Sequence, residues 1–390
     1  MNAKGIKVKT LARFGLRLYC ALAACALATI LVPPSAAQDG QEKDTQGKDT
    51  QDKIDVNDVS RTYTVHLPKG YDQAQHYPVV MLLHARNQNA DDMARLTHFN
   101  QLADKDGIIA VYPNAARGQW NIGVRPEQPS VAPRRGGGRR GGWGGGGGGG
   151  GGGWPGGGGG GYPGGGGGYP GGGQSGGQNP DETTRNRPEP ADDVAFLNQM
   201  LDALALKYSV DNRRIYAAGL EDGGFMALRV GCNMADRVAA IAAVGAALPK
   251  TMICLPSRAV PALFMKGTDD PIVPDNGGTY KPGQFHVLSA EDSAKAWAKF
   301  DRCAEKPAQD KIPPSQKGGK ETKTFTYSGC QDNAQVLLYS VKGGGSTWPG
   351  GEQYMSEKEI GKTSDAINAN ETIWTFLSTK KIAGDSGIEK

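Results

Sequence analysis

The fold of this chain is decided by one stretch, Ile215-Tyr216-Ala217-Ala218-Gly219-Leu220-Glu221-Asp222-Gly223-Gly224. Its first four residues form an apolar run that is typical of a strand buried on both faces. The glycines that follow suit a sharp turn, because they lack the Cβ that would crowd it. An apolar helix is expected to begin at Phe225. The stretch therefore predicts a buried strand that turns directly into a helix, with Glu221 at the apex.

Five further apolar runs have the composition of buried strands. They are Val79–Leu83, Ile108–Tyr112, Ala239–Val244, Pro261–Met265 and Val336–Val341. Helical patterns lie between some of these runs. Strands that alternate with helices at this spacing argue for an α/β fold with a mostly parallel central sheet and helices on both faces.

Three helices are expected from their residue patterns. In Asp192–Tyr208 the apolar residues recur at helical spacing and share one face, and the two aspartates suit the N-terminus. A second helix opens at Ser289, in capping-box spacing with Asp292. A third is expected near Ala366–Leu377.

The glycine excess belongs to one segment. Of the 59 glycines, 31 fall between positions 136 and 177, where Trp-Pro and Tyr-Pro pairs interrupt them. Such a composition cannot build a core, so we predict a disordered low-complexity Arg/Gly/aromatic insert at 134–190. The alternative is an adhesive arm whose arginines and aromatic rings stack on glycans or wall polymers. The glycines lack a three-residue period, which excludes collagen.

The first 37 residues have the three parts of a signal peptide: a basic stretch, an apolar run and small residues before the expected cleavage after Ala37. The apolar run Leu18–Val32 has 15 residues, fewer than the ~18 that indicate a transmembrane helix. We expect a secreted protein, extracellular or periplasmic, with no transmembrane segment in the mature chain. The alternative is a lipoprotein anchored through Cys25. Beyond the leader we expect a polar disordered spacer at 38–58, a single domain at 59–380 and a tail at 381–390.

The mature chain is close to neutral, with 39 basic and 40 acidic residues after position 37. A nucleic-acid partner held by a global basic field is therefore not expected. Four cysteines remain after the leader, an even number that predicts two disulfides in an oxidising compartment. Of the three pairings, we predict the sequence-local one, Cys232 with Cys254 and Cys303 with Cys330. No Cys-x-x-Cys pair occurs, so a zinc site is not predicted.

The quoted strand, turn and helix have the pattern of a nucleophile elbow, the turn that carries the attacking residue in α/β-hydrolases. With several other segments, the chain resembles the secreted polyhydroxybutyrate depolymerase and feruloyl esterase group of that fold over roughly residues 60–378. The matching segments are Leu67–Asp72, Met81–His84, Val111–Pro113, Trp120-Asn121, Asp192–Phe196, Val210-Asp211, Gly267–Pro274 and Gly343–Gly350. The resemblance implies an α/β-hydrolase fold and a carboxylic ester hydrolase that needs no cofactor.

The resemblance also implies where a Ser-His-Asp triad would stand. Glu221 occupies the position of the nucleophilic serine, Ser346 that of the histidine and Asp270 that of the acid. Lys266 takes another position where the family usually has a histidine. The implied oxyanion and pocket residues are His84, Ala85, Asp222 and Trp348, with Ala85 standing where a glycine usually shapes the oxyanion loop.

Two functions remain open on these residues. A carboxylate that attacks an ester forms an anhydride-like species, an uphill step, and no base stands at position 346. We therefore favour a pseudoenzyme that binds a small-molecule ester, a polyester or a cell-wall glycan. The alternative is an esterase or depolymerase that uses substitute groups, for which Ser346 with His84 is the pair to check.

Glu221 also has simpler interpretations. Its carboxylate at a helix N-terminus stabilises the helix without chemistry. With Asp222 and Asp270 it would offer oxygen ligands to a hard cation such as calcium, although no sequence spacing supports a metal site. A glycosidase with paired carboxylates is the weakest alternative, since nothing in the sequence fixes their separation.

Overall fold

The computed structural model describes residues 47–124, 191–313 and 320–383, all of which belong to one compact unit, Asp44–Lys390. The expected signal peptide, Cys25, the first part of the spacer, the insert at 134–190 and most of the tail lie outside the described residues. In the part of the chain that the structure describes, no helix combines the length and the apolar character needed to span a bilayer.

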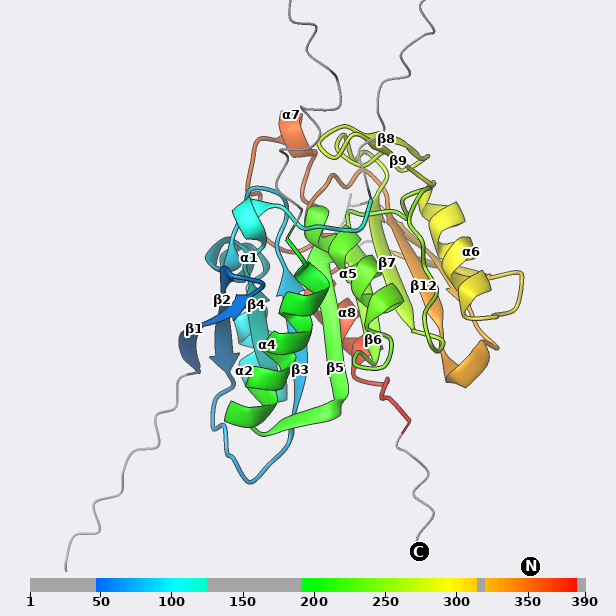
Figure 1. Ribbon diagram of the computed structural model, residues 1–390. Coiled ribbons are helices and arrows are strands. Elements are labelled where there is room, and N and C mark those ends of the chain that lie inside the picture. Colours follow the sequence, from blue (N-terminus) through cyan, green and yellow to red (C-terminus); the bar gives the residue numbers. More distant parts are fainter. Residues whose placement is uncertain (1–46, 125–190, 314–319, 384–390) are drawn as a thin grey trace, which may run out of the picture. The chain divides into compact units, whose positions relative to one another are not determined.

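A ten-stranded sheet forms the centre of the described unit, in the order β1-β2-β4-β3-β5-β6-β7-β12-β11-β10 (Figure 1). The six strands from β4 to β12 in this order are parallel to their neighbours, and antiparallel strands extend both edges. The strands are β1 Lys48–Val56, β2 Val59–Leu67, β3 Tyr77–Leu83, β4 Ile109–Pro113, β5 Val210–Leu220, β6 Ala240–Val244, β7 Ala262–Gly267, β10 Ala308–Ile312, β11 Thr322–Tyr327 and β12 Val336–Val341.

Both faces of the sheet are covered by helices. Helices α4 (Asp193–Lys207), α5 (Asp222–Asn233) and α6 (Ala290–Phe300) pack on one face and lie in front of the sheet in Figure 1. Helices α1 (Ala90–Thr97), α2 (Phe99–Asp106) and α8 (Ala369–Leu377) pack on the other. In β3, Val79 and Met81 belong to the first core and Val80 to the second. This double burial explains why the central strands are uninterrupted apolar runs.

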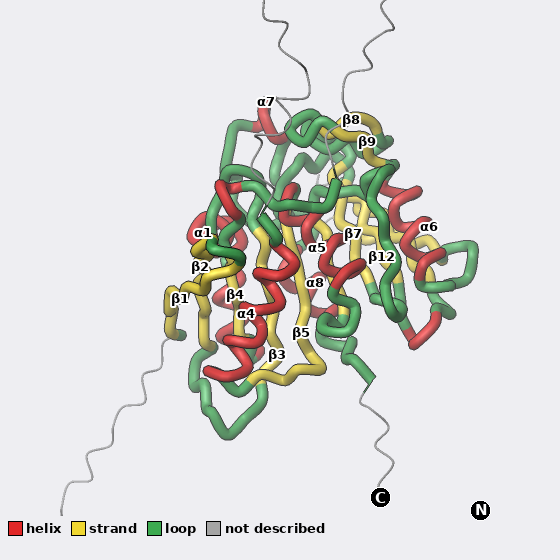
Figure 2. Tube along the Cα trace, in the orientation of Figure 1, coloured by secondary structure: helices red, strands yellow, loops and turns green. Residues whose placement is uncertain are grey.

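Short elements complete the unit, as Figure 2 shows in its loops and small helices. They are the 3₁₀ turns η1 (Ala116–Gly118) and η2 (Gln331–Asn333), the hairpin of β8 (Gly278–Tyr280) with β9 (Phe285–Val287), and α7 (Glu357–Ile360). The predicted caps are confirmed: the side chain of Asp192 accepts from Ala195 N and that of Ser289 from Asp292 N. The last helix begins three residues later than expected.

Strand β1 corrects the expected spacer at 38–58. Residues 48–56 pair with β2 along their whole length, and the domain therefore begins before position 59. β1 has only one neighbour, and its side chains are mostly exposed. Polar and charged residues are common on such edge strands because they discourage pairing with other chains. The composition that suggested a disordered spacer is thus the composition of a protected edge.

The two predicted disulfides are confirmed. Cys232 bonds to Cys254 and Cys303 to Cys330. The first joins the end of α5 to the loop before β7, and the second joins the loop after α6 to the turn after β11. The predicted fold is also confirmed: sheet order, parallel core and helices on both faces make an α/β-hydrolase fold.

Candidate functional site

The turn between β5 and α5 has the strained geometry of an elbow. Glu221 has φ 53° and ψ −110°, a conformation that costs a non-glycine residue about 1–3 kcal/mol. A Cβ on Gly219 would overlap the carbonyl of Gly223, and one on Gly223 would overlap the carbonyl of Leu83. The glycines are therefore required by close backbone packing. The turn presents the side chain of Glu221 at the carboxyl end of the parallel strands.

The carboxylate of Glu221 is bound at both oxygens. The backbone N–H of Arg86 donates to Oε2 over 2.8 Å, and the hydroxyl of Tyr280 donates to Oε1 over 2.5 Å. The residue is only 5% exposed. Arg86 lies in the loop after β3, where an α/β-hydrolase places one of the two N–H groups of its oxyanion hole. The carboxylate of Glu221 therefore accepts the hydrogen bond of the Arg86 N–H, which in an esterase would be donated to the reacting acyl oxygen.

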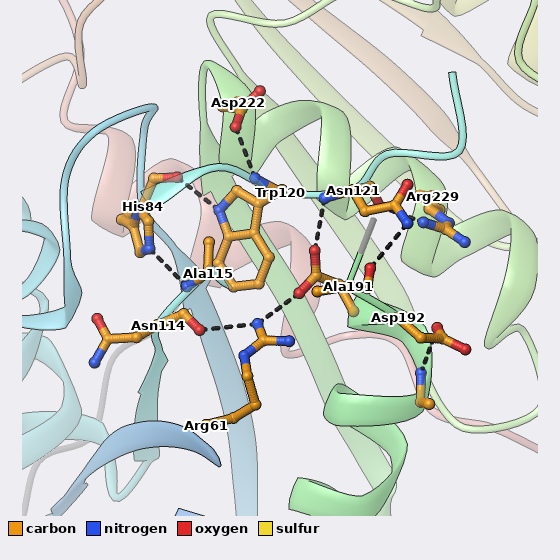
Figure 3. Close-up of polar contacts among 12 residues, drawn as sticks. Arg61, His84, Asn114, Ala115, Trp120, Asn121, Ala191, Asp192, Asp222 and Arg229 are labelled. Atoms are coloured by element: carbon orange, nitrogen blue, oxygen red, sulfur yellow. Dashed lines mark hydrogen bonds and ion pairs between the residues drawn. The ribbon is translucent and has the colours of Figure 1, made fainter. Parts of the chain in front are cut away.

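Asp222 also contacts Arg86, which binds the carboxylate of Glu221. The N–H of Trp120 donates to its Oδ2 over 2.9 Å, as Figure 3 shows, and Arg86 Nη2 lies 3.5 Å from Oδ1. Arg86 Nε also donates to the hydroxyl of Tyr280 over 3.2 Å. Burial and then the charge of Glu221 raise the pKa of Asp222 to about 7. Arg86 thus connects two adjacent buried acidic side chains.

His84 has a structural role in this loop. Burial lowers its pKa to about 4, so the ring is neutral near pH 7. Its Nδ1 lies 2.8 Å from the carbonyl oxygen of Ala85, and its Nε2 accepts the N–H of Ala115 over 3.0 Å. Trp120 Nε1 donates to the carbonyl of His84 (Figure 3). Both ring nitrogens are used by the backbone, which argues against His84 as a general base.

Asp270, at the acid position, forms a buried ion pair with Lys266, four residues earlier. Its Oδ1 accepts the N–H groups of Ile272 and Val273 over 2.8 and 2.9 Å. Burial lowers the pKa of Lys266, while Asp270 opposes this effect. Lys266 also donates to the carbonyl of Val273 over 2.5 Å. A lysine and two amides therefore hold the carboxylate that would orient a catalytic histidine.

Ser346 is fully buried, and its Oγ has no hydrogen-bond partner among the described residues. It is therefore not hydrogen-bonded to His84, the pair that the sequence singled out. Its N–H donates to the carbonyl of Ile360, and its carbonyl accepts the hydroxyl of Tyr354. Trp348 is also buried, and its Nε1 donates to Asn370 over 2.9 Å. The loop after β12 is thus fixed by backbone contacts, with Trp348 in the core.

The three implied triad positions still converge. Ser346 Oγ and the N–H of Glu221 both lie within 4 Å of the place where a Cβ on Gly245 would stand. The N–H of Asp269 donates to the carbonyl of Gly344 over 3.0 Å, which places the loop of Asp270 beside the loop of Ser346. The site has therefore kept its place in the fold while its residues make contacts unlike those of a triad.

Glu221, Asp270 and Ser346 do not line any of five cavities of about 270–580 Å³ that lie on the described part of the chain. Asp270 is held by Lys266 and so does not join Glu221 and Asp222 in the calcium site considered from the sequence. In the described ranges no three Asp, Glu, His or Cys side chains come together as metal ligands.

Sequence reasoning missed two residues of this network, Arg86 and Tyr280. Arg86 follows the quoted Met81–His84 segment, and its position in the oxyanion loop was the available signal. Tyr280 lies 59 positions from Glu221 in the sequence, on the short strand β8. No local pattern marks it.

Comparisons with known proteins found similarity to esterases. The family model described as "Esterase PHB depolymerase" matches residues 61–124. The esterase candidate NocK of Nocardia uniformis subsp. tsuyamanensis is 23% identical over 329 residues, covering 82% of this chain and 79% of its own length. Feruloyl esterase B of Piromyces equi is 35% identical over 162 residues, covering 40% of this chain but only 29% of its own. The acetyl xylan esterase of Aspergillus awamori superposes with a TM-score of 0.47 at 10% identity, covering 84% of this chain and 99% of its own.

Proposed function

We propose that this chain, which is similar to polyhydroxybutyrate depolymerase-type and feruloyl esterases, is an α/β-hydrolase that binds a ligand without hydrolysing esters. One observation carries the proposal. The residue at the nucleophile position is a glutamate whose carboxylate accepts the N–H of Arg86 and the hydroxyl of Tyr280. An acyl oxygen therefore meets a negative charge where an esterase offers a donor.

The other two triad positions support the same proposal. Ester hydrolysis requires a base that takes the proton of the nucleophile or of water. Ser346 cannot act as such a base, and the nearby His84 is neutral with both nitrogens used. Asp270 is neutralised by Lys266. Among the described residues, the site therefore lacks a nucleophile, a general base and a free carboxylate that could orient such a base.

The names of the matched family and relatives make a polyester or a feruloyl ester the ligand classes to test first, and a cell-wall glycan is the third class. Secretion is part of the proposal, supported by the leader and by the two disulfides, which suit an oxidising compartment. N-terminal sequencing of the exported protein tests it, with Gln38 as the expected first residue; a lipid-modified Cys25 would indicate the anchored form instead.

Hydrolysis of 4-nitrophenyl acetate and methyl ferulate by the purified protein tests the loss of catalysis. We expect rates no higher than those of the Asp270→Ala variant, which controls for contaminating esterases. The triple variant Glu221→Ser/Lys266→His/Ser346→His, which restores serine and histidine and removes the cation from Asp270, is expected to gain turnover. If the unmodified protein hydrolyses either ester and Glu221→Ala abolishes the reaction, the proposal is wrong and Glu221 is catalytic.

Co-sedimentation tests the binding part of the proposal. The Asp270→Ala variant again serves as a control, because it alters the buried site without changing the surface. We expect the protein to sediment with polyhydroxybutyrate granules or with feruloylated arabinoxylan, and the variant to sediment equally well. Absence of binding to both polymers would leave small ligands as the only class compatible with a binding function.

A further inference from the structure

A surface cavity of about 420 Å³ lies next to the elbow, and nothing in the proposed function assigns a role to it. We call it the neck cavity. Its wall comes from residues 59–62 at the start of β2, from the loop 114–121 after β4, and from Ala191. Trp120 belongs to this wall, and its N–H also binds Asp222. The volume falls within the range of small-molecule sites, about 300–1,000 Å³.

A buried ion pair makes this wall rigid. Arg61 is only 3% exposed, and its Nη2 donates to Asp193 Oδ1 over 2.5 Å and to the carbonyl of Asn114 over 3.0 Å. Its guanidinium carbon lies 4.0 Å from the ring centroid of Phe196. The other oxygen of Asp193 accepts the N–H of Asn121 over 2.6 Å. Figure 3 shows how Arg61 and Asn121 are held in place around this pair.

The two asparagine side chains in the wall already have hydrogen-bond partners. Asn114 Nδ2 donates to the hydroxyl of Thr62, and its Oδ1 accepts the N–H of Ala90. Asn121 Nδ2 donates to the carbonyl of Ala191, and its Oδ1 accepts the N–H of Gly123. Other side chains of the wall therefore provide the hydrogen-bonding groups that are free to meet a ligand.

The free groups are mainly donors. Within the described residues, the side chains of Ser60, Arg117 and Gln119 have no hydrogen-bond partner, and the guanidinium of Arg61 donates hydrogen bonds only through Nη2. The wall contains two arginines and no aspartate or glutamate. Asp193 forms an ion pair with Arg61 and offsets its charge, whereas the exposed Arg117 has no acidic partner among the residues that the structure describes. A ligand that fits this wall is rich in acceptors and negatively charged.

We propose that the neck cavity binds a small organic carboxylate, with the guanidinium of Arg117 as its principal charged contact. A guanidinium offers paired N–H donors that match the two oxygens of a carboxylate, and such charge-assisted bonds are the stronger kind. Ser60, Thr62 and Gln119 then meet hydroxyl or carbonyl groups of the same ligand. The inference goes beyond the proposed function and does not depend on it, because it concerns binding at a cavity that Glu221 does not line.

Two classes of organic carboxylate are tested separately, a sugar acid and an aromatic acid. Isothermal titration calorimetry of the purified full chain uses galacturonate and ferulate as probes and galactose as the neutral counterpart. We expect at least one of the acids to bind and galactose to bind at least about tenfold more weakly, because a hydrogen bond to a charged group is worth about 1.5–3 kcal/mol. Which acid binds more tightly identifies the source.

Arg117→Gln is expected to weaken binding of that acid by about tenfold or more. The matched control is Arg302→Gln, since Arg302 is also exposed and has the same left-handed backbone, φ 53° against 56° for Arg117. The control should bind as the unmodified protein does. The proposal is overturned if neither acid binds, if galactose binds as tightly as the acids, or if the two variants bind equally well. Ester turnover is not measured here, so failure of this test leaves the proposed loss of catalysis unaffected.

Discussion

Removing the hydroxyl of Tyr280 is the most direct test of the network that closes the elbow. This hydroxyl donates to Glu221 Oε1 over 2.5 Å and accepts from Arg86 Nε over 3.2 Å. Tyr280→Phe keeps the ring, which packs against Phe225 and Phe285 with centroids 4.9 and 5.0 Å away. The substitution therefore removes hydrogen bonds and leaves the packing.

The magnitude follows from the charge of the acceptor. A hydrogen bond to a charged group contributes about 1.5–3 kcal/mol, and a neutral one about 0.5–1.5 kcal/mol. Glu221 is buried, so solvent cannot replace the lost donor. With a urea slope of about 3 kcal/mol/M, we expect Tyr280→Phe to lower the unfolding midpoint by roughly 0.5–1 M.

Two tyrosines of the ten-stranded sheet, Tyr216 on β5 and Tyr339 on β12, calibrate the experiment. The hydroxyl of Tyr216 donates to the carbonyl of Lys380, a neutral acceptor, over 2.6 Å. Tyr339 has no hydroxyl partner among the described residues and lies half-buried on β12. Urea denaturation at pH 7 should rank the losses as Tyr280→Phe, then Tyr216→Phe, then Tyr339→Phe, the last within about 0.5 kcal/mol. A Tyr280→Phe loss no greater than that of Tyr339→Phe would refute the Glu221–Tyr280 bond.

Three further predictions concern the buried groups and a disulfide. The pKa of Asp222 is raised to about 7 in the folded state, so between about pH 4 and pH 7 the folded protein holds a proton that the unfolded chain releases. The free energy of unfolding should therefore fall by up to about 4 kcal/mol as the pH rises from about 4 to about 7. Asp222→Asn should make this pH dependence shallower. Lys266→Met should cost about 3–5 kcal/mol in urea denaturation, because it leaves the carboxylate of Asp270 buried without its cation. Replacing Cys303 and Cys330 by serine should cost about 2–4 kcal/mol by the same measurement, since the bridge closes a loop with a sequence separation of 27.

Each of these three predictions can be contradicted by a specific result. An unchanged pH slope in Asp222→Asn would show that Asp222 does not carry the proton. Lys105→Met is the control for the ion pair, because Lys105 and Glu371 are exposed partners whose separation should cost no more than about 1 kcal/mol. Equal losses in the two lysine variants would contradict a buried pair. Equal stability of the double serine variant would mean that the disulfide does not constrain the unfolded chain.

The central fold could be predicted because each element has a local signal. Strand β3 is apolar at every position since both of its faces are buried. The glycines around Glu221 reveal the elbow because close backbone contacts exclude a Cβ there. The four cysteines allowed few pairings, and the sequence-local one is confirmed.

The sheet edges and the contacts of the site carry no such signal. β1 is exposed on most positions, so its sequence resembles that of an unstructured segment. The sequence also placed His84 as the one histidine near the elbow, yet burial makes its ring neutral near pH 7, and its Nε2 accepts the N–H of Ala115, 31 positions away. Contacts of this kind are set by the topology of the sheet, which only the folded structure provides.

The substituted triad residues are best understood as a mutually compatible set. A buried aspartate without a cation costs several kcal/mol, and Lys266 supplies that cation where the family implies that a histidine would. A glutamate at the elbow would be equally costly without donors, and Arg86 and Tyr280 supply them. Each buried charge has acquired its own partner. It follows that changing Glu221 alone to serine, or Ser346 alone to histidine, removes one group while its partner remains, so neither single change should restore ester hydrolysis. The elbow has become a stabilised structural element, and recovering chemistry from it requires changes at all three positions together.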